Sequence, residues 1–431
     1  MNDETVLTDG TLPAGFQWGA VRAGIKASGN LDLGIAIARG AGSNAAVGAA
    51  MFTANRVVAA PVTVGRRHLA STGGRVAAVL VNSGNANCAN GEPGIEGCVA
   101  TCVAAAESVG CIFDEVFPSS TGIIGVPLPA EKIVAAIPEL VSSVGSTERH
   151  VESFVRAMMT TDTRVKTARA VVPIAAPLDA SLPEANAAEV RIWGAAKGAG
   201  MICPRLDAPV GSTATPPHAT MLVYLFTDVA ACAEHLQAAL AAAVEPSFNS
   251  ISIDGDTSTN DTVLLLASGA SGVPLRGDLV PKFDAALAEV CRSLARQIVA
   301  DGEGVSHAVT LDIRGAASAA DAKLVAKAIA HSPLCKTAWS SADPNWGRLL
   351  AAAGYSGATF DPARARIWIA DQPVFEYGVR APSFDESAAH RAMTQPEYTI
   401  TIDLGAGKAE CLFLTCDLTV EYVRINADYS T

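Results

Sequence analysis

The sequence is poor in charged and aromatic residues. Of its 431 residues, 17% are Asp, Glu, Lys or Arg and 5% are Phe, Trp or Tyr, whereas 50% are hydrophobic. So few charges and so many apolar residues exclude an intrinsically disordered chain. The scarcity of aromatic side chains, beside many Ala, Val and Gly residues, favours closely packed layers of helices and sheets.

Positive charge is scarce as well, because 31 Lys and Arg residues face 43 Asp and Glu residues and the net charge is -12. An acidic surface repels phosphate backbones, so we expect no nucleic-acid partner. The chain also lacks an apolar run of the roughly 18 residues that span a membrane. Its start, MNDETVLTDG, has neither the basic nor the apolar region of a secretion signal. We therefore expect a cytoplasmic protein without a membrane partner.

Several motifs of common sites are missing. The seven His and ten Cys residues form no CxxC or HxxxH pair, so we expect no metal and, without an export signal, reduced thiols. The loop DGDTSTND has Thr259 and Leu265 where a calcium-binding loop needs Gly and Glu. GxSxG does not occur, and GAAKGAG lacks the spacing of a phosphate-binding loop. These absences disfavour metal, phosphate and α/β-hydrolase chemistry.

The length of the chain predicts two or three domains. The turn GVPLRGD near Gly277 separates an expected N-terminal catalytic domain, 1–277, from a smaller C-terminal domain, 278–431. Both parts mix strands and helices, which predicts an α/β (α+β) fold.

Periodicity and turn residues place the individual elements. Helices are predicted at 94–109, from about 130, at 150–159, 231–244 and 283–298. Strands are predicted at 76–81, 189–193, 221–226, 309–313, 398–404 and 411–415, on each side of the loop 254–261, and in LTVEYVRIN near the end. GAGK is expected to join 398–404 and 411–415 as a hairpin. Residues 1–30 show no regular pattern.

Polar loops rich in Gly, Ser, Thr and Asn follow many of these elements. Six stand out: VNSGNAN, PSSTGIIG, MMTTDT, GAAKGAG, DGDTSTND and SADPNWGR. Each alone is best explained as a turn. Six in one chain favour a shared polar cavity, because rigid scaffolds carry function on their loops. Together with the isolated charges of Lys197 and Glu303, they suit a small zwitterion rather than a polyphosphate or an apolar ligand.

Eight motifs resemble the ornithine acetyltransferase family, also called glutamate N-acetyltransferase or arginine biosynthesis bifunctional protein. In order they are NSGNAN, SSTGIIG, MTTDT, KGAGMI, ATML, DGDTSTNDT, SADPNWGR and YVRINADYST. The resemblance runs from residue 12 to the last residue. It implies a self-processing enzyme with a layered αββα sandwich and a smaller C-terminal α/β domain whose tail returns to the active site.

The resemblance implies that the chain cuts its own backbone between Ala219 and Thr220. The products, 1–219 and 220–431, would assemble as an α2β2 heterotetramer. The new α-amine of Thr220, with a pKa of about 7.7–8.0, could take the proton of its own hydroxyl. The implied reaction is ping-pong transfer of acetyl from N2-acetylornithine to glutamate, in arginine biosynthesis, through an acetyl ester on Thr220. No cofactor is implied, and the use of acetyl-CoA as a second acetyl donor stays open.

The same resemblance implies the roles of other residues. Thr121 and Gly122 would stabilise the oxyanion of each half-reaction. The implied substrate contacts are Thr160 (or its neighbour Thr161), Lys197, Thr220, Glu303, Asn426 and Thr431. From charge alone, we assign Lys197 to a carboxylate and Glu303 to an ammonium group. For the DPNWGR loop we favour a structural role.

Two other functions stay open from the sequence: a self-processing aminopeptidase or amidase of related fold, and a non-catalytic amino-acid-binding homologue. Lys197, Glu303 and the ending YVRINADYST disfavour the first. Thr220, Thr121 and Gly122 disfavour the second. One departure from the family pattern is the segment RLDAPVGSTATPPH, 205–218, which is longer than in the family. Whether its length alters self-cleavage also stays open.

Overall fold

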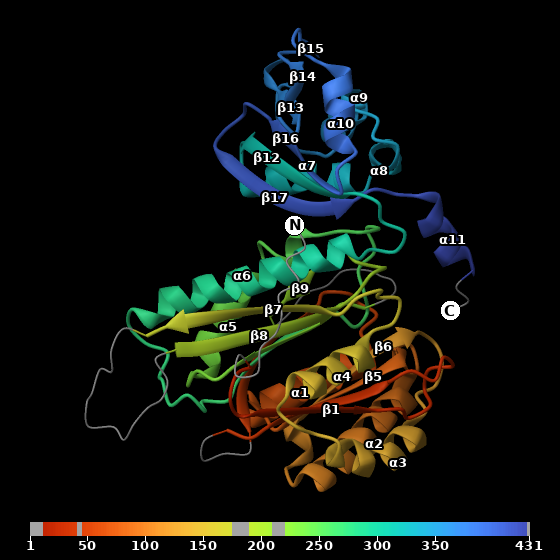
Figure 1. Cartoon of the computed structure of the whole chain (residues 1–431), viewed down its shortest axis with the longest axis vertical. Coiled ribbons are helices and arrows are strands. Elements are labelled where there is room, and N and C mark those ends of the chain that lie inside the picture. The colour runs from red at the N-terminus through yellow and green to blue at the C-terminus, as the bar shows by residue number, and fades with distance from the viewer. Residues whose placement is uncertain (1–11, 41–44, 175–188, 209–219, 429–431) are drawn as a thin grey trace. The chain divides into compact units, whose positions relative to one another are not determined.

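A computed structural model of the chain describes residues 12–40, 45–174, 189–208 and 220–428. Its internal contacts define two compact units (Figure 1). Unit 1 contains the chain up to Gly198 together with Pro204–Ser247 and Thr257–Leu294, and unit 2 contains Ala199–Cys203, Phe248–Asp256 and the chain from Ala295 onward. The contacts therefore separate the units within helix α6 (Leu279–Ala300), downstream of the boundary predicted near Gly277.

Unit 1 contains two β-sheets. The first sheet has the order β1-β2-β5-β6, with β5 and β6 parallel and the other pairs antiparallel. Its strands are β1 (Phe16–Val21), β2 (Leu33–Ala38), β5 (Ala78–Asn85) and β6 (Val116–Ile123). Strand β1 contradicts the prediction that residues 1–30 are irregular. β1 is stabilised by its pairing with β2, and its own short sequence does not show this pairing.

The second sheet has the order β4-β3-β11-β10-β8-β7, and β9 pairs with β3. Its strands are β3 (Ala46–Thr53), β4 (Arg75–Val76), β7 (Lys166–Pro173), β8 (Glu189–Lys197), β9 (Leu206–Asp207), β10 (Leu222–Thr227) and β11 (Thr262–Ala267). Strand β10 lies between β8 and β11, and all its residues are buried. A strand covered on both faces reads as a continuous apolar run, so the prediction for 221–226 is confirmed.

The two sheets enclose a core of aromatic and aliphatic side chains, among them Trp18, Phe117, Trp193 and Phe226. Helices α2 (Gly91–Val109) and α3 (Ala130–Ser142) pack on the outer face of the first sheet. On the second sheet, Gly194 of β8 packs against Leu294 of α6. The remaining helices of the unit are α1 (Ala60–Thr72), α4 (Glu148–Met158) and α5 (Ala233–Val244), with the short 3-10 turn η1 (Phe113–Glu115). This αββα layering confirms the predicted fold class.

Unit 2 contains a sheet in the order β15-β14-β13-β16-β12-β17. Its strands are β12 (Ala308–Ala316), β13 (Arg366–Ile369), β14 (Gln372–Glu376), β15 (Val379–Arg380), β16 (Glu397–Asp403) and β17 (Ala409–Cys416). Its helices are α7 (Ala319–Ala330), α8 (Pro333–Ser340), α9 (Trp346–Gly354), α10 (Glu386–Met393) and α11 (Val420–Asp428), with the 3-10 turns η2 (Phe248–Ser250) and η3 (Pro362–Arg364). Alternate residues of β12 pack with α7 in its core.

Three sequence predictions for unit 2 are wrong. GAGK does not close a hairpin, because β12 lies between β16 and β17 and pairs with both. LTVEYVRIN forms helix α11 instead of a strand, and Val420 and Val423 are exposed on it, so their spacing did not mark a buried face. The segment before the loop 254–261 makes an isolated bridge at Ile251 rather than a strand.

The DPNWGR loop caps helix α9. Asn345 Oδ1 accepts a hydrogen bond from the Arg348 N–H, and Arg348 Nη1 donates to the Leu334 carbonyl at 2.7 Å. These contacts agree with the structural role that we favoured. The ten cysteines carry free thiols, and most are buried, whereas Cys232, which directly precedes α5, is exposed. No helix in the described ranges is both long and apolar enough to cross a bilayer.

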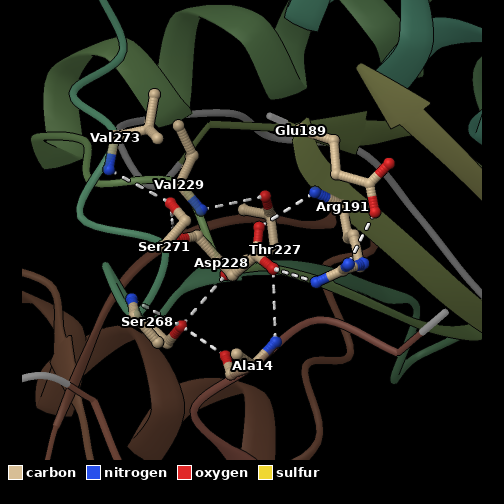
Figure 2. Close-up of polar contacts among 10 residues, drawn as sticks. Ala14, Glu189, Arg191, Thr227, Asp228, Val229, Ser268, Ser271 and Val273 are labelled. Carbon is tan, nitrogen blue, oxygen red and sulfur yellow. Dashed lines mark hydrogen bonds and ion pairs between the residues drawn. The ribbon is translucent and has the colours of Figure 1, made fainter. Parts of the chain in front are cut away.

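A buried carboxylate fixes the far end of β10 (Figure 2). Asp228 accepts hydrogen bonds from the N–H groups of Ala14, at 3.3 Å, and Arg191, at 2.9 Å. Ser268 Oγ donates to the Ala14 carbonyl at 2.7 Å. These contacts tie the start of the described chain, β8 and the loop after β11 to one end of β10. The residue of greatest interest, Thr220, lies at the opposite end of that strand.

We expect Phe226→Ala to lower the free energy of unfolding of unit 1 by about 3–5 kcal/mol, because it removes a ring packed against Phe16, Trp18 and Trp193. Urea denaturation monitored by tryptophan fluorescence measures the change. Val171→Ala, at a residue 45% exposed on β7, is the control and should change stability by less than about 1 kcal/mol. Equal effects of the two variants would contradict the assigned core.

Candidate active site

Thr220 lies two residues before the start of β10, and only 1% of its surface is exposed. Strand β10 runs antiparallel to β8, with Leu222 opposite Lys197. This register brings the last residue of β8 beside the residues that precede β10. The polar start of a buried strand, predicted from the sequence, is therefore also a buried position next to a lysine.

The ammonium group of Lys197 connects three of the predicted site residues. Its Nζ donates to the Thr220 carbonyl oxygen at 3.0 Å, to Thr121 Oγ1 at 3.1 Å and to Thr160 Oγ1 at 2.9 Å. An ammonium group has three N–H donors, and these three oxygens accept them. Of the two threonines that the sequence left open, Thr160 is the one that receives this bond. Lys197 is only 2% exposed, and its hydrogen bonds hold these three threonines close together.

Thr121 and Gly122 lie at the end of β6, where its pairing with β5 becomes irregular. Gly122 has a φ of 132°, and a Cβ there would collide with the backbone of Gly84. Only glycine permits this approach. Because Thr121 Oγ1 accepts from Lys197, its own hydroxyl proton is directed elsewhere. A hydroxyl proton and a neighbouring backbone N–H can together stabilise an oxyanion.

A buried carboxylate that the sequence reasoning missed supports this arrangement. Asp162 accepts hydrogen bonds from Lys166 Nζ at 2.6 Å, from the Gly198 N–H at 2.6 Å and from the Thr160 N–H at 3.0 Å. Burial alone would raise the pKa of Asp162, but the charges of Lys197 and Lys166 and these donors hold it well below its usual range. Asp162 therefore stays ionised. It fixes Gly198, which follows Lys197 in the chain, and Thr160, which accepts a hydrogen bond from Lys197.

The loop before β11, rejected above as a calcium site, also contacts Thr220. Ser258 Oγ donates to Thr220 Oγ1 at 3.2 Å, and the Met221 N–H donates to Asp261 Oδ1 at 2.7 Å. Asn260 Nδ2 donates to the carbonyls of Ala86 and Ser120, which belong to the VNSGNAN and PSSTGIIG loops. Residues of five of the six predicted loops thus contact one another in this cluster, whereas SADPNWGR lies outside it and caps α9. The DGDTSTND motif was the available signal for Ser258 and Asp261.

Two further predicted residues meet in unit 2. Asn426 Nδ2 donates to Glu303 Oε2 at 2.9 Å, and the Glu303 N–H donates to the Ala199 carbonyl at 2.8 Å. A Cβ at Gly200 would collide with the Glu303 carboxylate, so the glycine leaves room for it. Helix α11, which carries Asn426, is held by a 3.3 Å hydrogen bond from the Tyr422 hydroxyl to Asp254. An acidic group beside an amide suits a bound ammonium.

The other predicted positions lie elsewhere. Ala219 and Thr431 are outside the described residues, as is most of the long segment 205–218. In the described part of the chain, no group of three or more His, Cys, Asp or Glu side chains is placed to hold a metal ion.

Comparison with known proteins identifies the family. The sequence matches the ArgJ family over residues 17–431. The chain belongs to the ArgJ family. It is 44% identical to the arginine biosynthesis bifunctional protein ArgJ of Thermus thermophilus over 421 residues, which cover 97% of this chain and 99% of that one. Its identity to the protein of the same name from Geobacter sulfurreducens is 41% over 420 residues, with the same coverage.

A crystal structure of the arginine biosynthesis bifunctional protein ArgJ from Bacillus halodurans is 38% identical. It covers 48% of this chain and 98% of its own chain, with a TM-score of 0.46. Membership of the ArgJ family confirms the resemblance seen in the sequence and the predicted class of enzyme. This ArgJ-family chain is an acyltransferase of arginine biosynthesis that acts on small molecules.

We expect Asp162→Asn to destabilise the protein by about 3–5 kcal/mol at neutral pH, because it removes one partner of a buried ion pair. The pKa of Asp162 in the folded chain lies below its ordinary value of 3.8. Its carboxylate therefore stabilises the fold above about pH 4, and that stabilisation is lost as the pH falls further. The difference between wild type and variant should be constant from pH 5 to 8 and shrink below pH 4.

Urea denaturation at a series of pH values measures this difference. Glu152→Gln is the matched control, because it breaks an exposed i,i+4 pair with Arg156 on α4 and should cost less than about 0.5 kcal/mol. A pH-independent difference between wild type and Asp162→Asn down to pH 3 would contradict the assigned ionisation.

Proposed function

We propose that this enzyme transfers an acetyl group from N2-acetylornithine to glutamate through an acetyl ester on Thr220. The observation that carries the proposal is the contact of Lys197 with Thr220, Thr121 and Thr160. A candidate nucleophile, a candidate oxyanion donor and a candidate substrate contact thereby share one buried cluster. Such a cluster has the parts that acyl transfer to a hydroxyl requires.

The nucleophile is prepared by self-cleavage between Ala219 and Thr220, which frees the α-amine of Thr220. This amine takes the hydroxyl proton while Oγ1 attacks the acetyl carbonyl. The Thr121 hydroxyl and the Gly122 N–H stabilise the resulting oxyanion, and one such donor is typically worth about 2.7–4 kcal/mol. Ornithine leaves with the proton, and the acetyl group stays on Thr220.

In the second half-reaction the amine of glutamate attacks the acetyl ester, and Thr220 is regenerated. One amide replaces another, so the exchange needs neither ATP nor a cofactor. The positive charge of Lys197 attracts a substrate carboxylate, while its N–H groups donate to the protein oxygens named above. Glu303 and Asn426 receive the ammonium group, and Thr160 and Thr431 complete the substrate contacts. The two cleaved chains assemble as an α2β2 heterotetramer in the cytoplasm.

Intact-mass spectrometry tests the nucleophile. Wild-type protein should separate into chains 1–219 and 220–431, and N-acetylornithine should add one acetyl group to the second chain only. Thr220→Ala should remain one uncut chain without an adduct, because it lacks the attacking hydroxyl. Thr227→Ala, at the far end of β10, is the matched control and should behave as wild type.

A second arm of that experiment offers acetyl-CoA instead of N-acetylornithine. Relatives are named bifunctional, and we propose acetyl-CoA as a second donor that forms the same acetyl-Thr220. An adduct that maps to another residue, or turnover by Thr220→Ala, would overturn the mechanism.

We expect Glu303→Gln to raise the KM for N-acetylornithine about 10- to 100-fold, because it removes the charge opposite the substrate ammonium, a contact worth about 1.5–3 kcal/mol. Steady-state kinetics with N-acetylornithine as the varied substrate measure the change, and self-cleavage should proceed normally. Glu421→Gln, which alters an exposed pair with Arg424 on α11, is the control. An unchanged KM for Glu303→Gln would exclude the assigned contact.

A further inference from the structure

Self-cleavage and acetyl transfer need different bases. During transfer, the free α-amine of Thr220 can accept the hydroxyl proton. In the uncut chain the same nitrogen belongs to the amide that is to be cut, and an amide nitrogen is not a useful base. The first reaction of the protein therefore requires a group other than the one that serves every later turnover.

Two buried groups beside Thr220 have the necessary geometry. Ser258 is fully buried, and its hydroxyl contacts Thr220 Oγ1 at 3.2 Å while it accepts the Asn260 N–H at 3.0 Å. Asp261 is fully buried as well, and its Oδ1 is held by the Met221 N–H at 2.7 Å. The backbone and the hydroxyl of Ser258 also hydrogen-bond to the Asp261 carboxylate, although Oδ2 has no partner of good geometry within the described residues. A buried carboxylate oxygen without a donor is unusual and indicates a functional role.

We propose that Ser258 and Asp261 activate Thr220 for self-cleavage, with Ser258 passing the hydroxyl proton of Thr220 to Asp261. The proposal rests on the function proposed above, because it assumes the cut before Thr220. Ser258 touches the reacting oxygen and is the catalytic residue of the pair. Asp261 acts through Ser258 and is a positioning residue that also receives the proton.

Self-cleavage by this route needs no reactant other than water. The Ser258 hydroxyl, which donates to Thr220 Oγ1 at rest, first rotates toward Asp261 so that its oxygen can accept from Thr220. Thr220 Oγ1 then bonds to the carbonyl carbon of Ala219 while its proton moves to Ser258 Oγ and the Ser258 proton moves to Asp261. The bond between that carbon and the Thr220 nitrogen then breaks, and the proton returns from Asp261 through Ser258 to this nitrogen. Water hydrolyses the ester that remains, which yields the Ala219 carboxylate and the free Thr220 hydroxyl.

The charges near Thr220 favour Asp261 over the other candidates. Burial raises the pKa of Asp261 to about 7, although hydrogen bonds from Met221 and Ser258 and the charge of Lys197 on β8 act against it. Burial thus makes it a stronger base than an exposed carboxylate. Lys197 uses its ammonium N–H groups as donors to three oxygens, so it cannot accept a proton.

The other charged groups of the cluster fit the role less well. Asp162 accepts hydrogen bonds from Lys166 and two backbone N–H groups. These donors and the charges of Lys197 and Lys166 lower its pKa and make it a poor base. Lys26, near Lys197 and Asp162, has a pKa lowered to about 8 by burial, but its Nζ donates to the Leu31 and Met159 carbonyls. Among these groups, Asp261 alone combines a raised pKa with contact to the hydroxyl next to Thr220.

The test follows cleavage of freshly synthesised full-length chain by gel electrophoresis. We expect Ser258→Ala and Asp261→Asn to slow cleavage at least about 100-fold, as loss of a general base does. Asn keeps an oxygen that can hold the Met221 N–H, and Ser258→Thr, which keeps the hydroxyl, should cleave. Asp228→Asn is the matched control, a buried carboxylate at the other end of β10, and should cleave at the wild-type rate.

Three further measurements separate this role from a structural one. The wild-type rate should fall as the pH drops below about 7, while the residual rate of Asp261→Asn should not change between pH 5 and 8. Hydroxylamine, which cleaves esters, should release no chains from Asp261→Asn, because the ester does not form. The small fraction of Asp261→Asn that does cleave should accept acetyl from N-acetylornithine at the wild-type rate, since the α-amine then serves as base.

Wild-type cleavage rates in Asp261→Asn, or release of its chains by hydroxylamine, would overturn the relay and leave the proposed function intact. A wild-type chain that never cleaves would overturn the proposed function itself.

Discussion

The buried ammonium group of Lys197 is the interaction on which the site depends. Removing such an ion from water costs several kcal/mol unless oxygens and an opposite charge replace the lost hydration. Here Thr220, Thr121 and Thr160 supply the oxygens, and the charge of Asp162 lies nearby. Because each oxygen comes from a different segment, the requirement to satisfy one ammonium group fixes the ends of β6, α4 and β8 against the start of β10.

Two buried aspartates show how the same side chain acquires opposite properties in this cluster. Asp162 accepts from a lysine and two backbone N–H groups, and its pKa falls. Asp261 is equally buried, but its donors are Met221 and Ser258 rather than a lysine, and its pKa rises to about 7. The number of donors and the distance to positive charge decide whether a buried carboxylate remains a fixed anion or can exchange a proton.

Much of the fold could be predicted because buried strands and amphipathic helices leave local patterns. The apolar run of β10 and the three- and four-residue spacing of α6 both predicted the observed elements. The hairpin at GAGK failed because strand order is not local: β12, nearly a hundred residues earlier in the chain, lies between β16 and β17. Helix α11 was missed because a short alternation of Val and polar residues fits the two-residue period of a strand as well as the 3.6-residue period of a helix.

For the site, the sequence by itself determined the candidate nucleophile, the candidate oxyanion donors and the family, since these depend on residue types in ordered motifs. It also determined that Lys197 and Glu303 are isolated charges among polar loops. Only the tertiary structure decided which groups those residues contact. Register between β8 and β10 directs Lys197 to protein oxygens, and burial of the second half of the DGDTSTND loop places Ser258 and Asp261 beside Thr220. Charge and hydrogen bonding depend on neighbours in space, which a local pattern along the chain does not specify.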